Sequence, residues 1–439
     1  MTSSTVGEEF EADLVTRYGS PLYVYDLDRL RAAHRDLREA LPEPSRIYYS
    51  LKANPHPGLV GALREAGARA EITSRGELAS ALEAGCPAGE LLYSGPGKTP
   101  GELDEAVLAG VRSFSVESFG DLERIGAAAN ARGAVADCAL RINAAGAPGS
   151  AGLRMTGSAS QFGFDLDVLL DAPEQLLVAG TRIVGLHFFP LTNATDEEGL
   201  CAELVQSIRT AAELRETLGI ELRLVDLGGG FAAPYAVPGD RPRYPGLRAS
   251  VSKALDESLP GWRDGAPVVA FESGRYLVGD SGRLLCTVTD IKESRGTSYA
   301  VLDSGINHLG GLAGLGRLLP MSAKPLREQP LDGVVATGAP GPEGAERVTL
   351  AGPLCTPADV LGRAVPLPGL SPGTVLAFPN VGAYGLTASL LGFLGHPAPA
   401  EVVVDGGEVV SVTRLALQRH QVTGPGPRAT QHTAVKELT

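Results

Sequence analysis

The sequence predicts an α/β protein, a (β/α)8 TIM barrel followed by a C-terminal antiparallel β-domain. Eight short apolar runs alternate with amphipathic, helical stretches between residues 47 and 271. Strands that alternate with helices pair in parallel, and eight such units close a barrel. After Tyr276 the helical stretches give way to β-like runs separated by Gly and Pro turns, which indicates an antiparallel sheet. An open, doubly wound sheet of eight strands is the alternative.

The elements can be assigned in chain order. An opening arm holds a helix over 8–18, an extended segment over 21–25 and a helix over 27–40. The eight barrel strands are expected at 47–50, 69–73, 91–94, 114–116, 138–142, 183–188, 222–227 and 268–271. Helices are expected between them at 76–84, 102–109, 119–132 and 197–218. The later β-like runs are 283–291, 298–303, 347–350, 375–378, 401–404 and 409–412.

These elements divide the chain into three parts. Residues 35–275 form the barrel, 276–421 together with the arm 1–34 form the β-domain, and the polar stretch 422–439 is expected to be a flexible tail.

Composition excludes several classes of partner. The formal net charge of the 439 residues is −13, which repels nucleic acids and anionic membranes. We find neither a signal-peptide core at the N-terminus nor an apolar run long enough to cross a bilayer. The five cysteines show no CxxC pairing, which fits a reducing cytoplasm and argues against a zinc site, so we expect no metal.

The first candidate site residue is Lys52, where an apolar strand ends just before Pro55 and Pro57. A lysine at the mouth of a buried strand must be paired, neutralised or used covalently. Two interpretations are open: the amine reaches out to solvent, or it forms a Schiff base with a carbonyl cofactor.

Other chemical groups collect at the ends of the predicted strands, where a barrel holds its active site. Glu71 is at the second strand, Arg141 at the fifth and His187 at the sixth. The strand at 268–271 leads into Glu272. A carboxylate there could pair with Arg275 or face a pyridine nitrogen, and His187 could be a core histidine or a flat surface under a cofactor ring.

A glycine triplet suggests a phosphate site. Gly228, Gly229 and Gly230 follow the seventh strand, where backbone N–H groups can approach an anion closely. Gly274 and Arg275 follow the eighth strand, and a guanidinium binds phosphate in a bidentate manner. A tight turn is the simpler interpretation of the triplet. Taken together, lysine, glycines, arginine and carboxylate predict pyridoxal 5′-phosphate as the cofactor.

The β-domain carries a second group of candidates. Cys355 lies in a Gly- and Pro-rich turn that runs on to Asp359, and Tyr384 lies between glycines. Loops of this kind often complete a site built on another domain. An ordinary packed thiol and a half-buried aromatic ring are the alternatives.

The sequence resembles a known family, the fold-type-III pyridoxal-phosphate decarboxylases. This family includes the diaminopimelate, ornithine and arginine decarboxylases. The resemblance runs from about residue 21 to about residue 399 and rests on five motifs in the family's order. These are YSLKAN at 49–54, LGGGF at 227–231, ESGR at 272–275, GPLCTPAD at 352–359 and GAY at 382–384.

The resemblance implies the following roles. Lys52 would hold the cofactor, His187 would stack on its ring, and Glu272 would bind its nitrogen. Glu71 and Arg141 belong to the same cofactor site. The phosphate would lie among Gly228, Gly229, Gly230, Gly274, Arg275 and Tyr384. Cys355 would come from the partner in a homodimer with shared active sites, and would protonate the product carbon. Thr356, Asp359 and Tyr384 would contact the substrate.

Two departures from the family pattern concern the substrate. Thr356 stands where a carboxylate commonly contacts a distal amine, and Phe188-Phe189-Pro190-Leu191 follow His187 in place of Gly-Ser-Gln. The sequence resembles more closely a biosynthetic branch of the family, from antibiotic and siderophore pathways. This branch includes the butirosin-type glutamyl-carrier-protein decarboxylase. We therefore expect α-decarboxylation of an L-amino acid, either diaminopimelate-like or linked to a carrier or conjugate. The alternatives are an amino acid racemase and a non-catalytic pyridoxal-phosphate-binding homologue.

Overall fold

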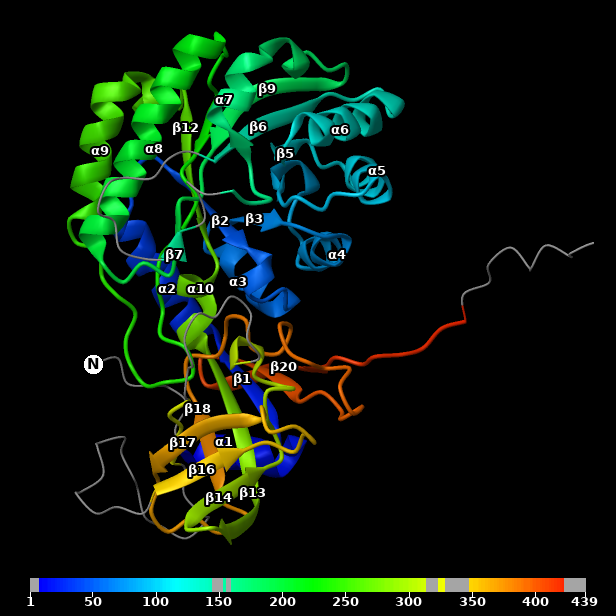
Figure 1. Ribbon diagram of the computed structural model, residues 1–439, viewed down its shortest axis with the longest axis vertical. Coiled ribbons are helices and arrows are strands. Elements are labelled where there is room, and N and C mark those ends of the chain that lie inside the picture. Colours follow the sequence, from blue (N-terminus) through cyan, green and yellow to red (C-terminus); the bar gives the residue numbers. More distant parts are fainter. Residues whose placement is uncertain (1–7, 144–152, 155–158, 313–322, 328–346, 422–439) are drawn as a thin grey trace, which may run out of the picture.

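The computed structural model of the protein describes residues 8–143, 153–154, 159–312, 323–327 and 347–421. The elements form two bodies along the long axis of the molecule, a barrel surrounded by helices and a β-rich domain (Figure 1). The tail expected at 422–439 lies outside the described residues.

The barrel is closed by eight parallel strands. Their order is β5-β4-β3-β2-β12-β11-β9-β6, and pairing of β5 with β6 joins the two ends of this row. This pairing confirms the barrel and makes the open-sheet alternative wrong. The strands are β2 (Arg46–Ser50), β3 (Arg69–Ile72), β4 (Leu92–Tyr93), β5 (Ser113–Val116), β6 (Ala136–Asn143), β9 (Thr181–His187), β11 (Leu224–Asp226) and β12 (Val268–Ser273).

The barrel helices lie outside the strands, where their apolar faces cover the sheet (Figure 1). They begin at polar caps: Thr99 and Glu102, for example, form a reciprocal capping box at the start of α5. The helices are α3 (Pro57–Glu65), α4 (Arg75–Glu83), α5 (Pro100–Ala109), α6 (Phe119–Ala131), α7 (Leu166–Asp171), α8 (Glu197–Leu218), α9 (Leu247–Ser258) and α10 (Arg275–Val278).

Four of these helices, α3, α7, α9 and α10, had no range assigned from the sequence, and α3 and α9 show why. The two prolines after Lys52 suggested a loop, but Pro57 occupies the first turn of α3, where its missing N–H costs nothing, and His56 caps the helix. Helix α9 buries Leu247, Val251, Ala254 and Leu255 along one face, which is a helical spacing that we did not assign.

The β-domain sheet is mainly antiparallel, as expected, and includes the arm. Two pairs are exceptions: β1 pairs parallel with β19, and β14 pairs parallel with β16. The strands are β1 (Leu22–Asp26), β13 (Gly282–Ser294), β14 (Thr297–Leu302), β15 (Leu326–Arg327), β16 (Arg347–Ala351), β17 (Val360–Pro366), β18 (Val375–Phe378), β19 (Ala400–Asp405) and β20 (Glu408–Arg414). The arm also provides α1 (Glu8–Tyr18) and α2 (Leu27–Ala40).

Short elements complete the structure. Strand β8 (Phe164–Asp165) pairs in parallel with the end of β6, and β7 (Leu153–Arg154) pairs with β10 (Leu191–Thr192). The 3-10 turns are η1 (Leu51–Ala53), η2 (Ala88–Glu90), η3 (Pro173–Leu176), η4 (Pro260–Asp264), η5 (Gly279–Ser281) and η6 (Gly310–Leu312). In the part of the chain that the structure describes, no helix combines the length and the apolar character needed to cross a membrane.

The two bodies meet beside η1, the turn that carries Lys52. The backbone N–H of Tyr384 donates to the carbonyl of Ala53 at 2.7 Å, and the Asn54 amide donates to the carbonyl of Gly382 at 2.9 Å. These bonds place a loop of the β-domain next to the ends of the barrel strands.

Candidate active site

Lys52 lies in η1, directly after β2, and its ammonium faces a buried carboxylate. Its Nζ is 3.3 Å from Oε2 of Glu71, a side chain that is 1% exposed, whereas the lysine side chain is 37% exposed. Burial opposes the charge, but neighbouring acidic groups, with the Glu71 carboxylate as the largest, outweigh it and raise the pKa of Lys52. The ammonium is therefore directed at a buried carboxylate, although part of the lysine side chain remains exposed.

The glycine triplet is a place where side chains cannot fit. A Cβ on Gly228 would lie 2.2 Å from the carbonyl oxygen of Phe188, and one on Gly229 would lie 2.4 Å from that of Glu272. Gly230 has a φ of 111°, which an L side chain rarely adopts. The triplet thus brings its backbone close to the site, as a phosphate cradle requires.

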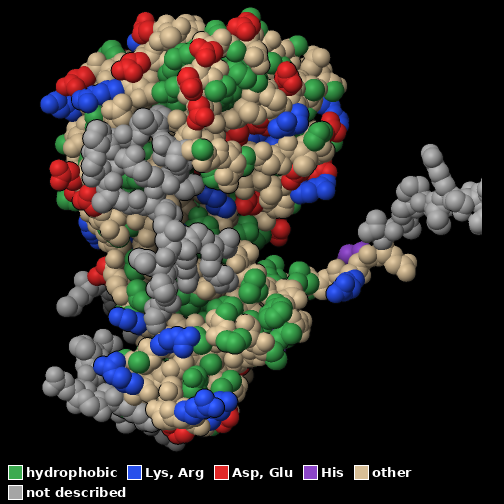
Figure 2. Space-filling view, viewed as in Figure 1, with side chains coloured by type: hydrophobic (Ala, Val, Ile, Leu, Met, Phe, Trp, Pro, Cys, Tyr) green, Lys and Arg blue, Asp and Glu red, His purple; other side chains and the backbone are tan. Residues whose placement is uncertain are grey.

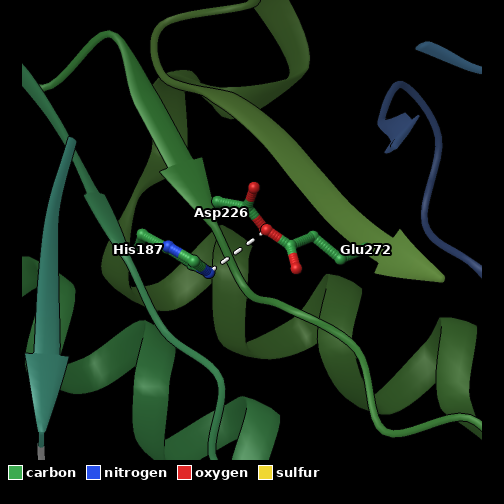
Figure 3. Close-up of side chains that lie close together, drawn as sticks. All are labelled: His187, Asp226 and Glu272. Atoms are coloured by element: carbon green, nitrogen blue, oxygen red, sulfur yellow. Dashed lines mark ion pairs between the residues drawn. The ribbon is translucent and has the colours of Figure 1, made fainter. Parts of the chain in front are cut away.

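His187, Asp226 and Glu272 end three neighbouring strands, β9, β11 and β12, and their side chains converge (Figure 3). Nε2 of His187 is 3.3 Å from Oε1 of Glu272, but neither atom has a hydrogen-bond partner. Oδ2 of Asp226 also lacks one, although its Oδ1 accepts the N–H of Gly228 at 2.9 Å. A buried polar atom without a partner is costly, and Glu272, which lines the cavity beside Lys52, therefore has an oxygen free for a ligand.

The charges of this cluster follow from its burial. Desolvation, together with the Glu71 and Asp226 carboxylates, raises the pKa of Glu272 well above its usual range. Burial raises the pKa of Asp226 to about 7, and burial followed by the charge of Arg141 lowers the pKa of His187 well below its usual value. Both shifts favour a neutral imidazole beside a protonated carboxyl over a charged ion pair.

The same three groups each offer an atom within 4.8 Å of the others, a spacing that could also hold a metal ion. A carboxyl that keeps its proton is a poor metal ligand. The expectation of no metal stays a prediction.

Arg141 is fixed at the side of the site. Its Nη1 donates to Oε1 of Glu117 at 2.8 Å, and Oε2 of Glu117 accepts the N–H of Gly163 at 2.7 Å. The guanidinium also lies over two aromatic rings, 4.7 Å from the centroid of Phe162 and 5.9 Å from that of Phe189. Arg141 thus adds positive charge without touching the carboxylate cluster directly.

Arg275 and Tyr384 bring the two bodies together at the site. Arg275 begins α10, and its Cζ is 4.8 Å from the ring centroid of Tyr384. Gly274 allows this approach, because a Cβ there would lie 2.8 Å from Cβ of Ala53. Both side chains line a cavity of about 30 Å³ beside Lys52 and Glu272.

Cys355, Thr356 and Asp359 lie elsewhere. Cys355 is exposed on a surface turn and is not among the described residues that line this cavity. The Asp359 carboxylate is buried and accepts the N–H groups of Ile306 and Leu354, both at 2.8 Å, so it shapes the turn. Within one chain, the structure does not bring these three residues together with Lys52.

Several residues of the site were missed by the sequence reasoning. The cavity is also lined by Phe189, Thr192 and Asn193, which follow β9. Deeper in the barrel, the Ser115 hydroxyl is 2.7 Å from Nδ1 of His187. Phe189 could have been found from the motif departure after His187, whereas nothing in the sequence pairs Ser115 with a residue 72 positions away.

The residues present fit pyridoxal phosphate. A ring nitrogen could use the oxygen of Glu272 that lacks a partner, Gly230 of the triplet lines the cavity with Arg275, where a phosphate could bind, and Lys52 is an amine on the same cavity. No single one of these features is specific, but the three functions occur within one barrel mouth.

Comparisons with known proteins point the same way. Residues 27–279 match the family described as pyridoxal-dependent decarboxylase, pyridoxal binding domain. The L-glutamyl-[BtrI acyl-carrier protein] decarboxylase of Niallia circulans is 34% identical over 91% of this chain and 92% of its own length.

Two further proteins are similar along most of the chain. The 2-[(L-alanin-3-ylcarbamoyl)methyl]-2-hydroxybutanedioate decarboxylase of Staphylococcus aureus is 31% identical over 86% of this chain and 92% of its own. The crystal structure of diaminopimelate decarboxylase from M. jannaschii with L-lysine superposes with a TM-score of 0.77 at 26% identity, covering 91% of this chain and 90% of the other.

Proposed function

The chain belongs to the family of pyridoxal-dependent decarboxylases, and from this premise we propose that it removes the α-carboxylate of an L-amino acid attached to a carrier protein or conjugate through its distal group. The observation that carries this proposal is Thr356, a neutral residue next to Cys355 where the resemblance leads one to expect a carboxylate for a free distal amine. L-Glutamyl linked to an acyl-carrier protein is the first substrate to test, because a relative that matches nearly the whole chain is named for it.

The linkage follows from the chemistry. The substrate's α-amine must reach the site of Lys52, and its α-carboxylate must be free to leave as CO2. A carrier can therefore be attached through the side chain alone, which also removes the charge of the distal group, and a neutral residue at position 356 fits such an uncharged linkage.

In this proposal each group has one task. Lys52 would hold the cofactor's aldehyde carbon, and the N–H groups of the triplet with Arg275 would hold its phosphate. When bound, pyridoxal phosphate accepts the electron pair left at Cα as CO2 departs. The proton that burial keeps on Glu272 would be available to the ring nitrogen, which favours this electron flow.

We infer that the active form is a homodimer in which Cys355 of the partner subunit delivers a proton to Cα. The support is that Cys355 is exposed and lies outside the cavity lining. Most of the exposed large hydrophobic side chains also belong to one part of the β-domain, namely Leu390, Phe393, Leu394, Val410, Val412, Leu415 and Leu417. Figure 2 shows hydrophobic side chains gathered on the β-domain beside the extended segment that follows β20. Such a patch is typical of an interface.

The carrier-linked substrate, and the resemblance to the biosynthetic branch, would place the reaction in the cytoplasm and in antibiotic biosynthesis. Cysteines without a CxxC pattern support the reducing compartment.

A turnover screen tests the proposed substrate. Purified protein with added pyridoxal phosphate is incubated with carrier-tethered L-glutamate, free L-glutamate, diaminopimelate and lysine, and mass spectrometry follows the loss of CO2. We expect turnover of the tethered substrate. Faster turnover of free diaminopimelate would contradict the proposal, and a D-isomer formed without loss of CO2 would indicate a racemase.

A further inference from the structure

Phe189 occupies the space between the two groups that would hold the ends of the cofactor. Its ring centroid is 5.2 Å from Nζ of Lys52. Its edge lies against the glycine triplet: a Cβ on Gly228 would be 3.0 Å from Cδ2 of Phe189, and one on Gly229 would be 3.5 Å from Cε2. The phenyl ring therefore contacts both the attachment point and the phosphate cradle.

A pyridine ring held by the same two groups must lie against this phenyl ring. The aldehyde carbon at Lys52 and the phosphate at the triplet are substituents of one small ring, so that ring spans the interval in which Phe189 lies. The cavity that Phe189 lines measures only about 30 Å³, so the phenyl ring takes up much of the space between the two groups. Phe189 is half-buried, whereas the neighbouring Phe188 is 2% exposed and packed in the core.

His187, to which the stacking role was assigned from the sequence, is placed differently. Its side chain is 2% exposed, and it is not among the described residues that line the cavity. Nδ1 is held by the Ser115 hydroxyl, and Nε2 faces the Glu272 carboxyl at 3.3 Å. Both ring nitrogens are thus directed at protein groups behind the cavity wall.

We propose that Phe189 supplies the flat surface on which the cofactor ring packs, and that His187 acts from behind by orienting Glu272. In this arrangement the surface is apolar and carries no proton, so proton delivery to the substrate depends on other groups. The proposal rests on the cofactor that family membership assigns, and is independent of the substrate.

The test compares four holoenzyme variants: Phe189→Leu, Phe189→Tyr, Phe162→Leu and His187→Gln. Phe162 is the matched control, because its ring also lies over Arg141 but does not line the cavity. The readouts are the dissociation constant for pyridoxal phosphate from fluorescence titration, and the visible circular dichroism of the bound cofactor. Borohydride reduction followed by peptide mapping of Lys52 shows in each case whether the cofactor is attached.

We expect Phe189→Leu to weaken cofactor binding about two- to ten-fold, the usual value of an aromatic pair, and to reduce the dichroic band. Phe189→Tyr should restore both, and Phe162→Leu should change neither. Unchanged binding and dichroism in Phe189→Leu, or loss of the band in His187→Gln alone, would overturn the proposal. If even the unaltered protein left Lys52 unlabelled, the cofactor assignment itself would fail, which is a separate result.

Discussion

The barrel mouth and the Cys355 turn of the β-domain differ in how much of a site each contains. At the barrel mouth, strand ends from β2 to β12 bring an amine, carboxyl groups, an imidazole and a glycine cradle together in one chain, mostly buried. The Cys355 turn exposes its thiol and is shaped by the buried Asp359 carboxylate. Under the proposed function, one chain would hold the cofactor and a second chain would complete the site with its cysteine.

The largest expected effect comes from Lys52→Ala. Loss of the amine should abolish covalent attachment and lower decarboxylation by ~10³-fold or more, the scale seen when a covalent nucleophile is removed. Absorbance of the bound cofactor and a CO2 assay measure both. Lys253→Ala is the control, because Lys253 is an exposed lysine on α9. Normal turnover in Lys52→Ala would show that the barrel mouth is not the active site.

Cys355→Ala tests the other side of the comparison. Turnover should fall about 10²-fold with cofactor attachment unchanged, since a proton donor is lost and the cradle is not. Cys201→Ala, a half-buried thiol of α8, is the control.

Mixing the two inactive variants then distinguishes one chain from two. If Lys52→Ala and Cys355→Ala subunits exchange freely, about a quarter of the sites regain both groups, because half of the dimers are mixed and each holds one complete site. Activity should therefore reappear on mixing. Two inactive proteins that stay inactive after verified subunit exchange would place Cys355 in its own chain's site.

The buried carboxyls of the barrel mouth predict a pH dependence of stability before cofactor is added. The folded pKa of Asp226, about 7, is above its unfolded value, so the folded state binds more protons. Its contribution is fully present below about pH 4, the unfolded pKa, and is lost as the pH rises towards about 7. Tm should fall over this range, and Asp226→Asn should reduce the slope. The control is Asp256→Asn at an exposed position. It should leave the slope of Tm over this pH range unchanged, because the Arg263 guanidinium holds the pKa of Asp256 below its usual value.

The smallest expected effect is that of Ser115→Ala. Losing one hydrogen bond to Nδ1 of His187 costs about 1 kcal/mol, so kcat should fall about five-fold while cofactor attachment is unchanged. The pH profile of kcat should also shift, because the imidazole is no longer fixed. Ser113→Ala on the same strand is the control. Equal effects of the two changes would show that Ser115 has a general structural role.

Local sequence patterns were sufficient for the barrel because its strands are short, apolar and regularly interrupted. All eight expected strands are present within a few residues, and both arm helices, Glu8–Tyr18 and Leu27–Ala40, match their expected bounds. Helix α3 was missed because a proline was taken as the end of regular structure, although it favours a first helical turn. The parallel pairing of β1 with β19 could not be predicted, since nothing local links residues so far apart.

The sequence by itself determined the fold class, the family and the identity of the amine, the glycine cradle and the carboxyl at Glu272, because each follows a strand end in a recognisable motif. Tertiary structure alone decided which of these groups share a cavity. It placed Phe189 beside Lys52, turned His187 towards Ser115 and Glu272, and left Cys355 outside. The physical reason is that a motif specifies the residues that follow a strand, whereas burial, side-chain direction and pairing across the barrel specify which of them meet.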